Sequence, residues 1–302
     1  TRDTNHAGTR AGEALDAGQS DTLACAGDEY DPSCHVMFHG QHPFDGRAQS
    51  AGWRSRGPAL YVPVVWGVMI TRLLIRKLAM TVSPLTIDVV SDVVCPWCFV
   101  GKRQLEQALE RWQRDSPDRP VEVRWHPFQL NPDLAPEGML RSDYLERKFG
   151  SADTSRIHVN VKRAAAAVGL DLAIEAIVRQ PNTLRPHALL EAAAEEGVQD
   201  ALAEALFTSY FQQARDLTDP TVLREIALGA GLSAAAIDRA LDDAQAHQAV
   251  AQADLRARRA GIRGVPCFIV NGRSAVSGAQ GADAILEAMT LEADDQPDQA
   301  SA

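Results

Sequence analysis

Two cysteines, Cys95 and Cys98, lie where a predicted strand gives way to a predicted helix. Residues 85–90 alternate and are rich in β-branched side chains, which is typical of a strand. From Pro96 onward, apolar side chains recur every three or four positions, as they do on one face of a helix. A second alternating segment spans 121–125. This part of the chain should therefore form a βαβ unit with parallel strands.

The rest of the chain gives the order of the remaining elements. Residues 143–258 are rich in Ala and Leu with helical periodicity, interrupted by Gly and Pro, which predicts a block of several helices. Two short strand-like segments then flank Asn271-Gly272, a pair typical of a tight hairpin turn, and a last helix should span 282–291. The predicted order is βαβ, helical block, ββα, which is an α/β arrangement.

The same patterns divide the chain into five parts. Two of them, 81–134 and 261–292, should form one α/β domain, and a helical segment, 135–260, should be inserted between them. Residues 1–80 should be a disordered or non-native extension, because most of them lack periodicity, and 293–302 should be a disordered tail.

An apolar stretch at 59–75 raises the question of a membrane span. It is shorter than the roughly 20 apolar residues that a spanning helix needs, and it contains Pro, Gly and Arg, so we predict no span. The first 30 residues lack the basic start and apolar core of a signal peptide. Since the predicted fold begins just after Met80, translation starting there or at Met69 is a working hypothesis.

Charge and cysteine content limit the function classes. The chain has 30 Lys and Arg against 40 Asp and Glu, a net charge of −10, whereas nucleic-acid-binding proteins present a basic surface. We expect no nucleic-acid partner. Five cysteines with only one close pair do not resemble the disulfide framework of a small secreted domain, and we interpret Cys25 and Cys34 as incidental thiols. A reducing, cytoplasmic compartment is expected.

The position of the cysteine pair predicts redox chemistry. Peptide dipoles and free N–H groups at a helix start stabilise an anion, so the thiol of Cys95 should be more acidic than a free thiol. Cys98 lies one turn further along and can attack a mixed disulfide on Cys95. Pro96 suits the first turn, and Trp97 offers an apolar surface to a substrate. The alternative, half of a zinc site, lacks a second close pair of Cys or His, so we predict no metal.

Several motifs along the chain resemble those of the DsbA-like thioredoxin family, within 85–291. They are Asp88–Cys98, Gly101–Arg103, His126–Pro132, Asn182–Leu184 with His187, Glu204–Phe207 with Tyr210–Phe211, Gly264–Pro266 and Val276–Gln280. The match is to a cytoplasmic branch named for polyketide-associated dithiol-disulfide isomerases, related to 2-hydroxychromene-2-carboxylate isomerase and kappa-class glutathione transferases. The resemblance implies a thioredoxin-like fold, βαβ…ββα, with a large inserted all-helical subdomain.

The resemblance also implies roles for residues far from the pair. Pro266 should follow a cis peptide bond and pack beside the active cysteines, and the backbone of Val265 should pair with an extended substrate. Cys267 stands where this branch has an aromatic residue. We interpret it as a small core residue. The alternative is an auxiliary thiol that forms a disulfide with Cys95, which would require Cα atoms within about 7 Å.

Relatives that usually have Ser at the position of Cys95 suggest a second possible function for the chain. The chain would then be a glutathione-dependent isomerase or transferase acting on an aromatic small molecule, with Asn182 and Ser277 binding the glutathione. The same two residues are equally suited to structural roles, with Asn182 capping a helix and Ser277 bonding in a turn. A third reading is a thioredoxin-like binding module whose cysteines are structural.

Three further side chains suggest proton chemistry. His126 and His187 are candidate proton carriers, although a lone His is more often structural, and we favour that interpretation. Asp88, on the strand before the cysteines, is a candidate acceptor for the proton of Cys98.

We predict a thiol-disulfide oxidoreductase or isomerase in which Cys95 attacks and Cys98 resolves. Pro96, Trp97, Val265 and Pro266 should contact the substrate, a protein or small molecule that carries a disulfide or thiol. The reaction needs no resident cofactor, although glutathione is a possible co-substrate. Homodimer formation stays open at this point.

Overall fold

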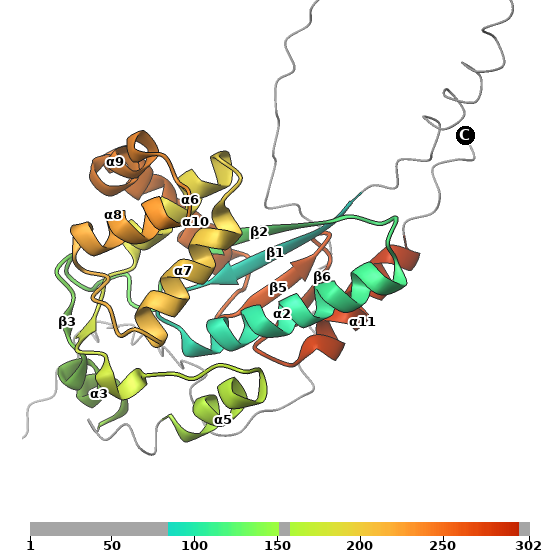
Figure 1. Ribbon diagram of the computed structural model, residues 1–302, viewed down its shortest axis with the longest axis horizontal. Helices are drawn as coiled ribbons and strands as arrows, with labels where there is room; N and C mark the ends of the chain where they lie inside the picture. The colour runs from blue at the N-terminus through green and yellow to red at the C-terminus, as the bar shows by residue number, and fades with distance from the viewer. Residues whose placement is uncertain (1–83, 151–157, 296–302) are drawn as a thin grey trace, which may run out of the picture.

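The computed structural model describes residues 84–150 and 158–295 (Figure 1). The predicted N-terminal extension, the apolar stretch at 59–75, Cys25 and Cys34 lie outside these residues. The strands are β1 (Leu85–Ser91), β2 (Val121–Pro127), β3 (Met139–Leu140), β4 (Arg179–Gln180), β5 (Cys267–Val270) and β6 (Ser274–Ser277). The helices are α2 (Pro96–Asp115), α3 (Arg141–Phe149), α5 (Val159–Ala167), η2 (Ile174–Ala176), α6 (Leu184–Glu195), α7 (Gln199–Phe211), α8 (Pro220–Gly229), α9 (Ala234–Asp242), α10 (Ala244–Arg259) and α11 (Ala282–Asp294).

In the part of the chain that the structure describes, no helix combines the length and apolarity needed to cross a membrane.

The central sheet has the strand order β2-β1-β5-β6. β1 and β2 are parallel, with Leu85 opposite Val121, which confirms the predicted βαβ unit. β5 pairs antiparallel with β1 and forms the predicted hairpin with β6. Asn271 and Gly272 both have positive φ in its turn, as a type I′ turn requires. The Asn271 side chain also accepts a hydrogen bond from the Thr86 N–H, so this turn is tied to β1.

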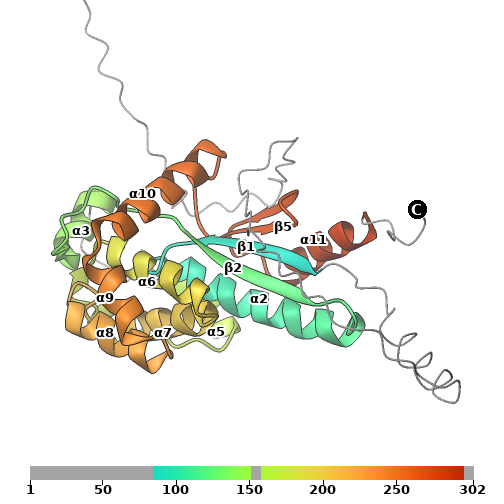
Figure 2. The same cartoon turned by 90° about the horizontal axis from the view of Figure 1, so that it is seen from above.

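Successive side chains of β1 point to opposite faces of the sheet, and both faces are buried. Ile87 and Val89 point to the face covered by α2 and α11, and they belong to the larger hydrophobic cluster. Val90 points to the opposite face and packs with Ile262 and Ala257, the latter near the end of α10. Figure 2 shows α2 and α10 on opposite sides of β1 and β2. Because both faces are covered, β1 is apolar along most of its length.

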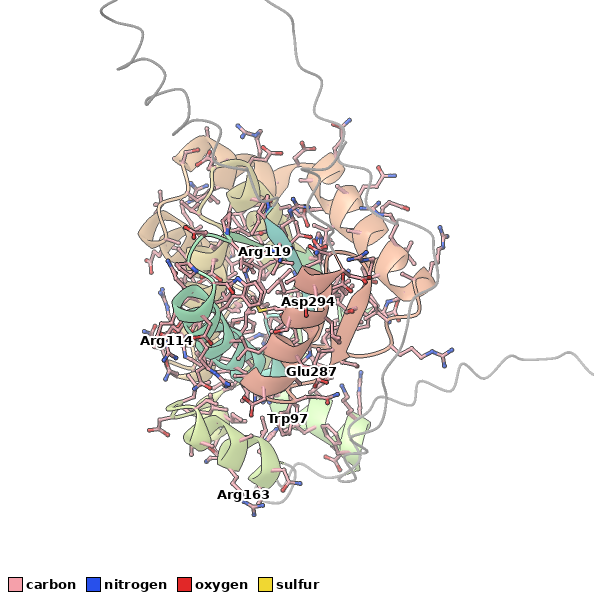
Figure 3. All side chains as sticks on the ribbon, turned by 90° about the vertical axis from the view of Figure 1, so that its right-hand side faces the viewer. Trp97, Arg114, Arg119, Arg163, Glu287 and Asp294 are labelled. Carbon is pink, nitrogen blue, oxygen red and sulfur yellow. The ribbon has the colours of Figure 1, made fainter. Side chains whose placement is uncertain are left out.

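Helix α2 begins directly after Cys95 and contains Cys98, and both cysteines are buried. Cys95 is its N-cap residue, with extended backbone dihedrals, and Pro96 occupies the first turn, where its missing N–H has no cost. Phe99, Leu105 and Ala108 form the buried stripe that packs on the sheet. In Figure 3 side chains fill the space between these layers, and charged groups such as Arg163 on α5 point outward.

Aromatic stacking and ion pairs connect the helical insertion to α2. The Phe99 and Phe207 rings are stacked with centroids 5.3 Å apart. The buried ammonium group of Lys102 lies 3.2 Å from Glu204 and 3.3 Å from Asp200, both on α7. These contacts hold the insertion against the helix that begins at Cys95.

Two details differ from the sequence predictions. The two-residue strands β3 and β4 pair with each other, with Met139 opposite Gln180, and were not predicted because strands this short leave no alternating pattern. The last helix continues to Asp294, three residues beyond the predicted end.

Candidate active site

The two cysteines of the predicted pair lie together at the start of α2. Cys95 and Cys98 are both buried, with 6% and 1% of their surfaces exposed. The backbone N–H of Cys98 donates a hydrogen bond to the Cys95 carbonyl oxygen at 3.0 Å, which closes the first turn. The two thiols also share a side-chain hydrogen bond. The spacing of two intervening residues therefore places the sulfur atoms within reach of each other.

The surroundings of Cys95 favour its thiolate. A hydrogen bond from the Cys98 thiol is the largest influence and lowers the pKa of Cys95 below its ordinary value. Burial acts against it, but the backbone N–H groups of Cys98 and Trp97 lower the pKa further. Asp92 opposes these donors by charge repulsion. The helix start thus works through individual N–H donors as well as through its dipole.

Cys98 has the opposite character. Burial is the largest influence and raises the pKa of its thiol well above the ordinary value, and the hydrogen bond and charge of Cys95 raise it further. The Ser91 hydroxyl and the backbone of Asp92 act in the other direction. The surroundings therefore favour the thiolate of Cys95 and the protonated thiol of Cys98.

The loop before β5 lies against the pair. The Val265–Pro266 peptide bond is cis, as the resemblance implies. The Cys95 thiol donates a hydrogen bond to the Val265 carbonyl oxygen at 3.6 Å, and the Gly278 N–H donates to the Pro266 carbonyl at 2.7 Å. A Cβ at Gly101 would lie 2.9 Å from Pro266 Cγ, so only glycine lets α2 approach this loop so closely.

The structure corrects the role expected for Asp88. Its side chain lies on the face of the sheet that α10 covers, and its carboxylate is 2.7 Å from His126 Nε2. Asp92 is the carboxylate near the pair: it is fully buried, and it accepts a hydrogen bond from the Leu130 N–H at 2.7 Å. Its position directly after β1 was the sequence signal for it, because residues at a strand end reach the start of the following helix.

Cys267 is separated from the pair by the sheet. It lies opposite Val90 and packs with that residue and Ile269, whereas its neighbour Phe268 faces α2. Burial alone raises the pKa of the Cys267 thiol to about 12. This placement is that of a core residue and gives no support to a disulfide with Cys95.

Asn182 and Ser277 both make hydrogen bonds, Asn182 through its side chain and Ser277 through its backbone carbonyl. Asn182 donates to the Leu134 carbonyl at 2.6 Å and accepts from the Leu184 N–H at 2.8 Å, so both ends of its amide hold the start of α6. The Ser277 carbonyl accepts a hydrogen bond from the Gln280 side chain at 2.7 Å in an exposed turn. Their predicted glutathione contacts stay predictions.

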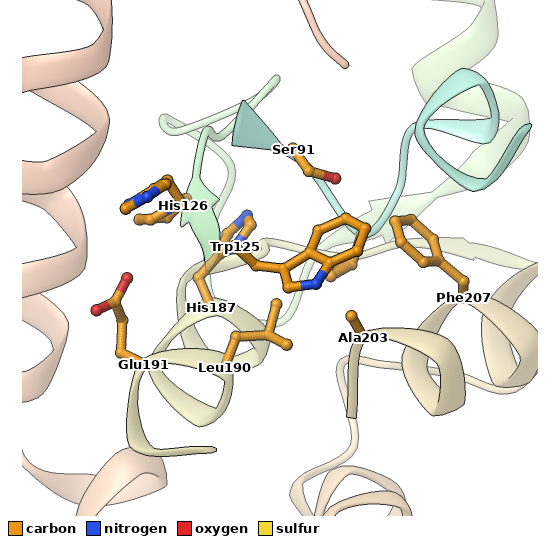
Figure 4. Close-up of a pocket in the computed structure, with 10 residues that line it drawn as sticks. Ser91, Trp125, His126, His187, Leu190, Glu191, Ala203 and Phe207 are labelled. Atoms are coloured by element: carbon orange, nitrogen blue, oxygen red, sulfur yellow. The ribbon is translucent and has the colours of Figure 1, made fainter. Parts of the chain in front are cut away.

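A small pocket lies between β1, β2, α6 and α7 (Figure 4), and Ser91, whose hydroxyl acts on Cys98, is one of its lining residues. Ser91, His126, His187 and Glu191 contribute its polar side chains, and Trp125 is among its apolar ones. The cavity has a volume of about 10 Å³, close to the minimum that one water molecule needs. The two histidines that the sequence suggested separately are thus brought to one site, together with Ser91, which the sequence reasoning did not single out.

Across residues 84–150 and 158–295, no three His, Cys, Asp or Glu side chains are grouped so that they could hold a metal ion.

The fold and the paired thiols define a thioredoxin-like thiol-disulfide oxidoreductase. Residues 86–290, more than half of the chain, match the family model of the DSBA-like thioredoxin domain, and the chain belongs to that family. It is similar to a probable DsbA oxidoreductase from Streptomyces coelicolor, with 32% identity and a TM-score of 0.62 over 70% of this chain and 92% of that one. The family assignment predicted from the motifs is confirmed.

Two other proteins are also similar to this chain. The uncharacterized protein YwbO of Bacillus subtilis is 28% identical over 68% of this chain and 96% of its own length. A putative protein disulfide isomerase from Nitrosomonas europaea shares the fold at 14% identity, with a TM-score of 0.55 over 71% of this chain and all of that one. The chain therefore covers nearly the whole length of these relatives.

Proposed function

We propose that this enzyme exchanges disulfides through Cys95 as the attacking thiolate and Cys98 as the resolving thiol. The observation that carries the proposal is the asymmetry of the pair: hydrogen-bond donors lower the pKa of one buried thiol, while burial raises the pKa of its neighbour. Thiol-disulfide exchange requires one ready thiolate and a second sulfur within reach.

The reaction conserves electrons between the pair and its substrate. The Cys95 thiolate attacks one sulfur of a substrate disulfide, forms a mixed disulfide, and releases the other sulfur as a thiolate. Cys98 then loses its proton and attacks Cys95 Sγ, which forms the Cys95–Cys98 disulfide and releases the second substrate thiolate. The substrate gains two electrons and the pair loses two, and the reverse sequence oxidises a substrate dithiol.

The substrate is proposed to be a protein or small molecule that lies along the loop before β5. Pro96 and Trp97 are only partly buried at the start of α2, and Val265 is partly buried beside them. An extended substrate segment can pair with the Val265 backbone while its sulfur meets Cys95. The chemistry requires the two thiols and the substrate disulfide, and glutathione would enter as a co-substrate that regenerates the pair.

Insulin reduction, followed by turbidity with dithiothreitol as electron donor, tests this proposal. Cys95→Ser should abolish the activity, and Cys98→Ser should accumulate a mixed disulfide that mass spectrometry detects at Cys95. Equal rates for the parent and both variants would contradict the proposal. Glutathione-dependent turnover that survives Cys98→Ser but requires Asn182 would favour a transferase.

The cytoplasm is the proposed site of action, since five cysteines with one close pair suit a reducing compartment. Acid trapping and alkylation in intact cells would show Cys95 and Cys98 largely as thiols there, whereas a predominantly oxidised pair would count against this location.

A further inference from the structure

Two polar atoms beside the cysteine pair are buried without a hydrogen bond. Ser91 Oγ and His187 Nε2 are both inaccessible, and within the described residues neither has a hydrogen-bond partner of normal geometry. The residues are 5% and 2% exposed. Leaving a buried polar atom unpaired costs about 1–3 kcal/mol, so two such atoms facing one cavity call for an explanation.

Both residues line the small pocket between β1, β2, α6 and α7. Its volume of about 10 Å³ suits one water molecule, and a buried water typically bonds to polar groups that otherwise lack partners. His187 Nε2 also lies 3.4 Å from Asp92 Oδ1, in a geometry too poor for a hydrogen bond. One water in this cavity would satisfy Ser91 and His187 together.

Ser91 connects this pocket to the sulfur that must lose a proton, because it lines the pocket and also acts on Cys98. The Ser91 hydroxyl is close enough to Cys98 to favour its thiolate, although the contact falls short of a regular hydrogen bond. Cys98 itself is 1% exposed, so bulk water does not reach its sulfur directly. Its proton needs an internal path before Cys98 can resolve a mixed disulfide.

We propose that Ser91, one ordered water and His187 form the path that carries the proton away from Cys98 during resolution. The inference rests on the proposed function, because it assigns a proton route to the resolving step. The Ser91 hydroxyl accepts the Cys98 proton and passes its own to the water, and the water passes one to His187 Nε2. The Cys98 thiolate attacks Cys95 Sγ, the substrate thiolate leaves, and the imidazolium later releases its proton to solvent.

Several charged or titratable groups surround His187. Asp92 faces it from the end of β1, His126 from β2 and Glu191 from α6. Asp88 pairs with His126, and Arg256 on α10 interacts with Glu191. Glu191, which lines the same pocket, offers the next acceptor for the proton.

The test separates attack from resolution by stopped flow. The full chain with Cys25→Ser and Cys34→Ser is reduced and mixed with 5,5′-dithiobis(2-nitrobenzoate). The first thionitrobenzoate released reports attack by Cys95, and the second reports resolution by Cys98. In Ser91→Ala and His187→Gln the second phase should slow about 100-fold near neutral pH, the scale of a lost proton transfer. The first phase should change less than about twofold, because the nucleophile is untouched.

The pH profile distinguishes proton transfer from a structural effect. In both variants the midpoint of the second phase should move to higher pH, and the rates should converge with the parent rate in alkali, where hydroxide removes the proton. The control is His247→Gln, since His247 bonds the Ala240 carbonyl on α9 and should leave both phases unchanged. Unchanged second phases in Ser91→Ala and His187→Gln would overturn the proton path while leaving the cysteine roles intact.

Two further outcomes decide the remaining cases. If His187→Gln loses the first phase as well, it is misfolded, and Ser91→Ala alone decides: an unshifted profile there overturns the proton path. A parent protein without any first phase would instead contradict the proposed function.

Discussion

Buried thiols lie on both faces of the central sheet, and their surroundings shift their pKa values in different directions. Cys95 and Cys98 on the α2 face are 6% and 1% exposed, and Cys267 on the α10 face is 5% exposed. Burial raises the pKa of Cys267 to about 12, whereas donors at the helix start bring that of Cys95 below its ordinary value. A sheet one residue thick thus separates a thiol whose thiolate is favoured from a thiol that stays protonated, and the difference lies in the N–H and S–H groups around each sulfur.

The largest expected difference is in alkylation rate. Iodoacetamide should modify Cys95 more than about 1000-fold faster than Cys267 near neutral pH, because only thiolate reacts and a thiol of pKa about 12 is almost entirely protonated there. Peptide mapping of a time course by mass spectrometry measures both rates in one sample. Comparable rates would break the contrast between the two faces, and labelling in denaturant, where all thiols are exposed, is the control.

A larger residue at position 101 should push α2 away from the loop before β5. The effect should be confined to the face of the sheet that carries Cys95 and Cys98. Gly101→Ala places a Cβ 2.9 Å from Pro266 Cγ and 3.0 Å from Phe268 Cζ, so helix and loop must separate. Insulin reduction should fall about tenfold, with a loss of unfolding free energy of about 1–3 kcal/mol from overpacking. Gly229→Ala in α8, where nothing lies within 4 Å of the new Cβ, should leave activity unchanged. Equal behaviour of the two variants would show that the close approach does not matter.

The Cys98 thiol should control the acidity of Cys95. Since the Cys98 hydrogen bond is the largest influence lowering the Cys95 pKa, Cys98→Ala should raise the alkylation midpoint of Cys95 toward the ordinary value. Cys98→Ser keeps a donor and should raise it less. Thiolate absorbance near 240 nm against pH gives the midpoint. Cys267→Ala is the matched control, and a shift there would contradict the separation of the two faces.

Cys267 should affect alkaline stability. Its pKa is about 12 in the folded protein, against an ordinary value of 9.0, so between these values the unfolded thiol ionises while the folded one does not. The unfolded state then binds fewer protons, and stability falls with rising pH by about 1 kcal/mol per pH unit in this window. Urea unfolding at pH values near 8 and 10 should show a steeper loss for the parent than for Cys267→Ala. Parallel losses would contradict the buried, protonated state of this thiol.

The smallest expected effect belongs to the carboxylate that faces away from the pair. Asp88→Asn should change insulin reduction less than about twofold, since it removes a charge on the α10 face, where Asp88 pairs with His126 and does not face the cysteine pair. A loss comparable to that of Cys98→Ser would restore Asp88 as a proton acceptor.

Elements with a regular hydrophobic pattern or a turn signature could be predicted from the sequence. The strands at Leu85 and Val121, the hairpin at Asn271 and the helix from Pro96 each have a period or a turn signature, and all are present. The side of the sheet to which a residue points was harder, because a shift of one residue reverses it. Asp88 was a candidate neighbour of Cys98 for this reason, and its side chain lies on the opposite face of the sheet.

The convergence of Ser91 and His187 could not be predicted at all. They come from a strand and from an inserted helix, and no spacing in the sequence relates them. Only the packing of α6 against β2 brings them to one cavity.

The thiol of Cys95 reaches a carbonyl that is synthesised 170 residues later. A ribosome that has made only the βαβ unit and the helical insertion has therefore exposed a reactive dithiol motif without the strand that completes its platform. Long-range pairing of this kind forms slowly compared with local helices. Pairing of β5 with β1 is therefore a long-range step, and only after it does the loop that contains Val265 lie beside Cys95.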